Sequence, residues 1–131
     1  MISSEFLIGE PLCCQAKFLK QTLNITANST NVIYYDPTTD PYAIPSIGTA
    51  SPGGTWNAEL QSTLTSVLGT TTYDIGHLFG DSGGGGNAGC IGCVCSTDGS
   101  KGSGYTSPGD GVPAGDNFDI DYVAHEMGHQ L

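Results

Sequence analysis

The sequence predicts a single α+β domain, because stretches with helical periodicity and β-rich runs occur together in a chain of 131 residues. Trp56 to Leu68 places its apolar residues on one helical face, and Gly69 follows as a stop signal. A second helical stretch runs from Asp116 to Leu131. Val32 to Tyr35 and Tyr73 to Gly80 are rich in the β-branched and aromatic residues typical of strands.

Other segments carry weaker signals. Pro11 to about Leu23 has helical spacing and predicts a short helix, although its last residues also fit a strand. Leu23 to Thr26 is expected to pair with Val32 to Tyr35 as a hairpin. Asp36 to Gly54, with four prolines, predicts an extended loop, and Cys90 to Cys95 predicts a short strand.

The composition predicts many turns and excludes two classes of partner. The chain has 20 Gly and 7 Pro, and both Gly83 to Gly86 and Ser96 to Gly115 are predicted to be glycine-rich loops. It carries 13 Asp plus Glu against 3 Lys plus Arg, a net charge of -10. Nucleic acids and anionic membrane surfaces select Lys and Arg, so neither is an expected partner. No stretch reaches transmembrane length, and no signal peptide is visible.

Three of the five cysteines, Cys90, Cys93 and Cys95, lie within one short segment. This spacing fits a disulfide cluster or a thiolate metal site. A zinc finger needs a second ligand pair, which the adjacent Cys13 and Cys14 do not supply. An oxidised, secreted protein fits better, with at least one cysteine whose partner is missing here. We therefore expect an internal piece of a longer secreted precursor.

The most informative motif is His125-Glu126-Met127-Gly128-His129 near the C-terminus. Residues four apart share a helical face, so His125 and His129 can bind one Zn²⁺ ion together. Glu126 is placed to reach the attacking water and act as general base. The apolar residues of the same helix are expected to form a buried stripe beside the ligands: Ile120, Val123, Ala124, Met127 and Leu131.

Three segments, in this order, resemble the reprolysin-like (adamalysin-type) metzincin metallopeptidases, especially their secreted bacterial members: Tyr73 to Gly80, Gly89 to Cys95 and Phe118 to Leu131. The resemblance runs from about Leu23 to the C-terminus. Residues 1 to about 20 show no match and are expected to be a divergent helix or a foreign leader. The resemblance implies a metzincin upper subdomain, with a mixed twisted sheet, a backing helix and a C-terminal zinc-binding helix.

The resemblance also assigns individual residues. Ile75 to Phe79 would correspond to the substrate-lining edge strand, with His77 near the cleft as a surface residue of that strand and not as a zinc ligand. Cys95 would correspond to a cysteine whose disulfide partner lies downstream of the zinc helix. Cys90 and Cys93 are additional to the family pattern, and a local disulfide between them stays open.

The family signature is H-E-x-x-H-x-x-G-x-x-H followed by a Met-turn, and this chain ends at Leu131, before the glycine and the third histidine. Residues 1–131 are therefore expected to be one partial catalytic domain, with a poorly matched segment at 1–22 and no lower subdomain. With two of three histidine ligands, we expect weak zinc binding and little peptidase activity.

The implied function is a zinc-dependent metalloendopeptidase that cleaves protein or peptide substrates, with Glu126 as general base and His125 and His129 as metal ligands. The alternative is a non-catalytic secreted binding or adhesion module that retains a relic of the zinc helix. Codons for Gly and His at the third and sixth positions after His129 would favour the enzyme. A cysteine metal site formed by Cys90, Cys93 and Cys95 is a third hypothesis.

Overall fold

The computed structural model describes residues 3–8, 33, 34, 36, 38–42, 55–80, 85–107, 112 and 114–131. The predicted helix from Pro11 to Leu23 and the predicted hairpin strand from Leu23 to Thr26 lie outside the described residues. None of the described helices combines the length and the apolar character that crossing a membrane requires.

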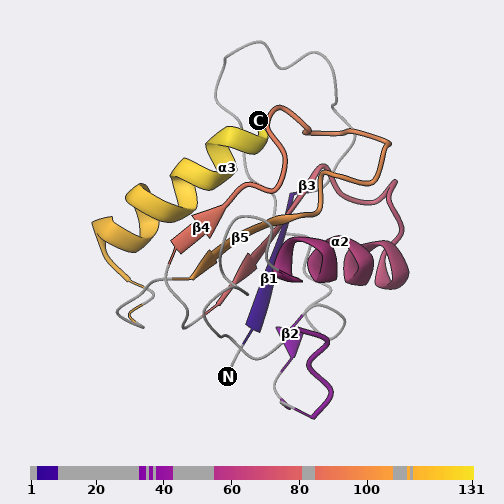
Figure 1. Ribbon diagram of the computed structural model, residues 1–131, viewed down its shortest axis with the longest axis horizontal. Helices are drawn as coiled ribbons and strands as arrows, with labels where there is room; N and C mark the ends of the chain where they lie inside the picture. The colour runs from indigo at the N-terminus through magenta and orange to yellow at the C-terminus, as the bar shows by residue number, and fades with distance from the viewer. Residues whose placement is uncertain are drawn as a thin grey trace.

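Within the described residues, five strands form one mixed sheet with the order β2-β1-β3-β5-β4 (Figure 1). Their bounds are Ser3–Ile8 for β1, Ile33–Tyr34 for β2, Ile75–Phe79 for β3, Gly85–Asn87 for β4 and Gly104–Ser107 for β5. β1 runs antiparallel to β2 and β3, β3 and β5 are parallel, and β4 is antiparallel to β5. The prediction of an α+β fold is confirmed.

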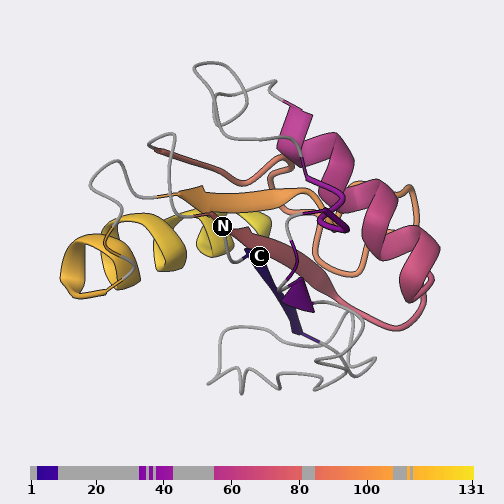
Figure 2. The same cartoon turned by 90° about the horizontal axis from the view of Figure 1, so that it is seen from below.

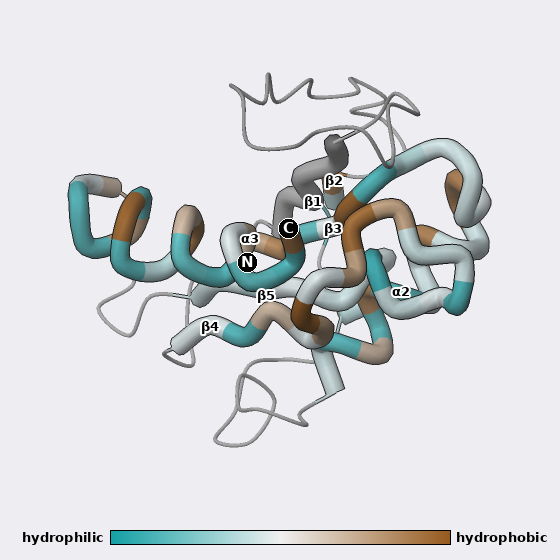
Figure 3. The backbone as a smooth tube through the Cα atoms, turned by 90° about the horizontal axis from the view of Figure 1, so that it is seen from above, coloured by the Kyte–Doolittle hydropathy of each residue, from teal (hydrophilic) through white to brown (hydrophobic). Residues whose placement is uncertain are grey.

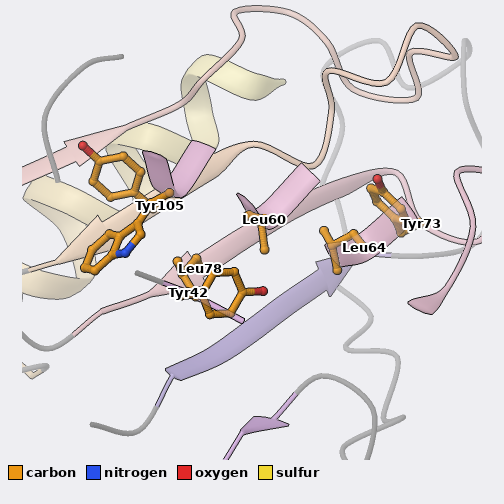
Figure 4. Packing of buried hydrophobic residues seen from close by; sticks show 7 residues of the cluster. Tyr42, Leu60, Leu64, Tyr73, Leu78 and Tyr105 are labelled. Carbon is orange, nitrogen blue, oxygen red and sulfur yellow. The ribbon is translucent and has the colours of Figure 1, made fainter. Parts of the chain in front are cut away.

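Helix α2, Thr55–Val67, packs on one face of this sheet through the stripe that its sequence predicts. Trp56, Leu60 and Leu64 are almost completely buried, and the indole of Trp56 meets the ring of Tyr105 edge-on at 5.5 Å. Gly69 ends the helix region with φ of +83°, the left-handed conformation that glycine adopts without strain. The core between α2 and the sheet contains Tyr42, Trp56, Leu60, Leu64, Tyr73, Leu78 and Tyr105 (Figure 4).

The C-terminal helix packs on the opposite face of the sheet (Figure 2). Neighbouring residues of a strand point to opposite faces of the sheet. Leu78 accordingly joins the core beneath α2, and the adjacent His77 contacts Gln130 of the C-terminal helix. The helix begins as a π-helix, η1 (Asn117–Ala124), and continues as α3 (His125–Gln130). The His125 N–H donates to the carbonyl oxygen of Ile120, five residues back, which is the hydrogen-bond spacing of a π-helix.

The predicted apolar stripe of this helix is mostly wrong. Of its five residues only Met127 is buried, while Ile120 and Leu131 are 58% and 46% exposed. The buried positions are instead Phe118, Met127 and Gln130. The reason is the π-helical winding of η1, which has more residues per turn than the α-helical spacing assumes. Figure 3 accordingly shows hydrophilic residues along much of this helix.

Three strands lie where the sequence did not predict them, and one predicted strand is absent. Residues 90–95 form turns and bends, because Gly89, Gly92 and Cys95 have positive φ values of 71°, 64° and 60° that interrupt an extended run. β4 and β5 lie in stretches that predict glycine-rich loops. β1 lies in the segment that was expected to be a helix or a foreign leader, and it pairs with both β2 and β3.

Candidate metal centre

The structure brings the imidazoles of His125 and His129 together on the exposed side of α3. Their Nε2 atoms are 3.0 Å apart, and the rings are nearly perpendicular, with centroids separated by 4.6 Å. Two nitrogens that bind one tetrahedral zinc ion at about 2.0–2.1 Å lie roughly 3.3 Å apart. The observed separation is close to that value, so the pair fits a shared zinc ion.

Glu126 points to the edge of the sheet at β4. Its side chain is half-buried, and a Cβ atom at Gly86 would lie 2.7 Å from both its Cγ and its Oε1. A residue larger than glycine at this position would therefore displace the carboxylate. The carboxylate also raises the pKa of Tyr105, although burial is the main reason that this pKa rises to about 12. Glu126, which follows His125 in the sequence, thus lies against the edge strand β4.

Within the described part of the chain, no group of three or more His, Cys, Asp and Glu residues is arranged to hold a metal ion. His125 and His129 are therefore a two-ligand set there, and the exposed Asp119 and Asp121 of η1 do not join them.

The opposite side of α3 is held by Gln130, whose side chain is fully buried. Its Nε2 donates to the carbonyl oxygens of Gly76 and Lys101, both at 3.3 Å. Because its amide nitrogen is used in this way, its Oε1 is the acceptor for His77 Nδ1 at 3.4 Å. A Cβ atom at Gly104 would lie 2.6 Å from this oxygen, so a glycine is needed for the contact.

His77 is fully buried, which contradicts the expectation of a surface histidine on an edge strand. β3 lies in the middle of the sheet, and the edge strand beside the candidate centre is β4. His77 Nδ1–H donates to Gln130, so its Nε2 accepts from the Thr106 hydroxyl at 2.8 Å. Burial lowers the pKa of His77 to about 4, and the hydrogen bond to Gln130 offsets only part of that effect. The imidazole is therefore neutral.

The sequence did not predict this network of His77, Thr106 and Gln130. The available signal was the spacing of Met127 and Gln130, three residues apart, which places both on one helical face. A polar residue on the buried face of a helix requires hydrogen-bond partners.

A loop that contains the clustered cysteines holds the end of α3. We call residues 89–96 the cysteine loop. The N–H groups of Gly92 and Val94 donate to the carbonyl oxygens of His129 and Gln130, at 2.8 Å and 2.9 Å. The last carbonyls of a helix have no partner within the helix, so these two bonds fix the end of the segment that carries the second histidine.

The cysteines differ from two expectations. Cys95 is disulfide-bonded, and neither Cys90 nor Cys93 is its partner, because both are free. No cysteine follows Cys95 in these 131 residues, so a partner downstream of the zinc helix is wrong for this chain. A three-cysteine metal site is also wrong, because the sulfur of Cys95 is not a thiolate. Cys90 and Cys93 are both free, so they do not form a local disulfide here.

Comparisons with known proteins agree with the geometry. A family model described as metallo-peptidase family M12B, reprolysin-like, matches residues 15–131. The match begins at residue 15, whereas the resemblance was expected to begin at about Leu23. No curated protein and no solved structure gives a significant match to the chain.

Proposed function

Because this chain belongs to the reprolysin-like peptidases of metallo-peptidase family M12B, we propose that it is a zinc-dependent metalloendopeptidase domain. The observation that carries the proposal is the separation of 3.0 Å between the Nε2 atoms of His125 and His129. Glu126, adjacent in sequence, lies against the edge strand β4 at Gly86. Two candidate metal ligands, a carboxylate and the edge strand of the described sheet thus occur in one place.

Each residue has a separate role in this proposal. His125 and His129 hold the ion through their Nε2 atoms. Zinc supplies Lewis-acid activation of water and of the scissile carbonyl. Glu126 accepts the proton of the attacking water and passes it to the leaving amine, as a general base and then a general acid.

The proposed substrate is a peptide in extended conformation that lies along β4. This strand is at the edge of the sheet, and an edge strand can pair with an added strand. Gly85 and Gly86 have no side chains that separate such a peptide from Glu126. A peptide bound there reaches the carboxylate and the histidine pair together.

The same proposal includes weak metal binding by this chain and a secreted location. One ligand of a structural zinc site contributes ~3 kcal/mol, or about a hundredfold in affinity. Two histidines therefore bind zinc more weakly than a three-histidine site. The disulfide at Cys95 supports an oxidising compartment, because disulfides are rare in the cytosol.

Calorimetric zinc titration and a peptide-cleavage assay test the proposal together. We expect His125→Ala and His129→Ala to abolish zinc binding, because each removes one of two ligands. Glu126→Gln keeps the metal ligands, so it should retain zinc binding and lose any cleavage. Cys90→Ser combined with Cys93→Ser is the matched control and should leave zinc binding unchanged.

Zinc binding that survives both histidine substitutions would contradict the metal assignment. Nanomolar zinc affinity of the 131-residue chain would contradict its proposed weakness. The alternative, a secreted binding or adhesion module with a relic zinc helix, predicts that Glu126→Gln and wild type behave alike in every assay.

A further inference from the structure

Cys90 and Cys93 are two free thiols, separated by two residues, in the cysteine loop. Their sulfurs contact the same residue: Cys90 Sγ lies 3.5 Å from Ser100 Oγ, and Cys93 Sγ lies 3.9 Å from Ser100 O. Cys93 Sγ also lies 3.4 Å from the carbonyl oxygen of Cys90. These contacts place both sulfurs on one side of the turn, next to each other.

The two thiols have different environments. Cys93 is buried, with 4% of its surface exposed, whereas Cys90 is only partly buried. Burial raises the pKa of Cys93 to about 12, and the hydrogen bond and charge of Cys90 add to this effect. Cys90, the more exposed of the two residues, is therefore the one that we expect a reagent in solution to reach first.

We propose that Cys90 and Cys93 form a reversible redox site, which exchanges with oxidised thiols to give a Cys90–Cys93 disulfide. The Cys90 thiolate attacks one sulfur of a small-molecule disulfide, which forms a mixed disulfide and releases one thiol. The Cys93 sulfur then attacks Cys90 Sγ, breaks the mixed disulfide and releases the second thiol. Two protein thiols lose two electrons and two protons, which the small-molecule disulfide takes up.

The oxidation state of this pair is transmitted to the metal helix. Gly92 and Val94 are the immediate neighbours of Cys93, and their N–H groups hold the carbonyl oxygens of His129 and Gln130. A disulfide between Cys90 and Cys93 restricts the turn that aims these two N–H groups. Oxidation is therefore expected to make both hydrogen bonds more persistent. This inference goes beyond peptidase activity and is tested without it.

Differential alkylation with mass spectrometry tests the exchange. The mildly reduced protein is equilibrated with glutathione disulfide, free thiols are blocked with maleimide, and remaining disulfides are then reduced and labelled with a second reagent. Cleavage before aspartate isolates residues 81–97, which carry all three cysteines of the loop. We expect both Cys90 and Cys93 to lose the first label after oxidation and to gain the second.

Two matched variants test the order of the steps. Cys93→Ser lacks the resolving sulfur, so glutathione should remain attached to Cys90. Cys90→Ser lacks the attacking sulfur, so Cys93 should take up little glutathione. Equal glutathione on both variants, or full first-reagent labelling of both cysteines in oxidised wild type, would overturn the proposal. The wild-type experiment decides the question even if a variant fails to fold.

Amide hydrogen exchange tests the transmission to the helix. The N–H groups of Gly92 and Val94 should exchange several-fold more slowly in the oxidised protein than in the reduced protein. The N–H of Thr72, which bonds only within its own turn at Gly69, is the internal control and should not change. Unchanged exchange at Gly92 and Val94 in a protein with the disulfide would overturn the link to the metal helix.

Discussion

The two sides of α3 differ in what surrounds them. On one side, His125 and His129 are exposed and their rings contact each other. On the other side, Gln130 is fully buried and reaches three groups of the sheet and its adjoining loop: His77, the Gly76 carbonyl and the Lys101 carbonyl. Adjacent residues of one helix therefore have opposite environments.

This difference separates the residues that do the chemistry from those that place them. His125 and His129 are exposed, so their substitution should weaken metal binding and hardly change the free energy of unfolding. Gln130 is buried and is not one of the proposed metal ligands, so its substitution should mainly lower the free energy of unfolding. The following predictions use the free energy of unfolding as a common scale, from the largest effect to the smallest.

Gln130→Leu should destabilise the protein by about 3 kcal/mol. Leucine has a similar size but cannot accept from the Nδ1–H of His77, and the buried imidazole then has an unsatisfied donor. Urea unfolding measures the change. A loss below about 0.5 kcal/mol, the value expected for an exposed residue, would show that the two sides of the helix do not differ.

Acid should weaken the buried side through His77. Its pKa is lowered from 6.5 to about 4, so the unfolded chain binds a proton at a higher pH than the folded chain does. The stability contributed by the neutral imidazole is present above pH 6.5 and is lost as the pH falls toward 4. Between pH 7.5 and pH 5, this residue alone should cost about 2 kcal/mol.

Urea unfolding at these two pH values, in wild type and in His77→Gln, measures the contribution. His125 and His129 remain in both proteins, so the difference between the two pH slopes belongs to His77. Equal slopes would contradict a buried, neutral His77.

Two glycines near the helix give a matched pair of tests. Gly104→Ala should destabilise by about 2 kcal/mol, because its Cβ would lie 2.6 Å from Gln130 Oε1 and 2.8 Å from His77 Nδ1. Gly128→Ala, in α3 itself, meets no atom within 4 Å and should stabilise the helix by about 1 kcal/mol. Thermal unfolding of both variants compares them, and shifts of the same sign would contradict the packing of the buried side.

The smallest effect on stability is expected for His129→Ala. The exposed imidazole has few contacts, so the change should stay within about 0.5 kcal/mol without zinc. Stabilisation by added zinc, clear in wild type, should disappear in the variant. Thermal unfolding with and without zinc measures both quantities, and a large loss of stability in the metal-free variant would contradict the division of roles.

The sequence predicted features that depend on local spacing. The stripe of Trp56, Leu60 and Leu64 and the placement of His125 and His129 on one face both follow from helical periodicity. The strands β4 and β5 were not predicted, because apart from Tyr105 they contain only glycines and small polar residues, which give no apolar alternation.

Tertiary placement explains the other differences. Whether a strand is central or at an edge depends on its neighbours, and β1, far away in sequence, covers the edge of β3 that would otherwise be free. This pairing buries His77 in the middle of the sheet. The local winding of η1 likewise moved Ile120 to the surface, and no pattern in the sequence distinguishes a π-helical turn from an α-helical one.

X-ray absorption spectroscopy of the protein with one equivalent of zinc tests the central claim most directly. The exposed pair of His125 and His129 predicts nitrogen neighbours at about 2.0–2.1 Å with the outer scattering of imidazole rings. The same spectrum of His129→Ala should lose part of that imidazole scattering. Sulfur neighbours at about 2.3 Å would place the metal on cysteines and contradict the assignment.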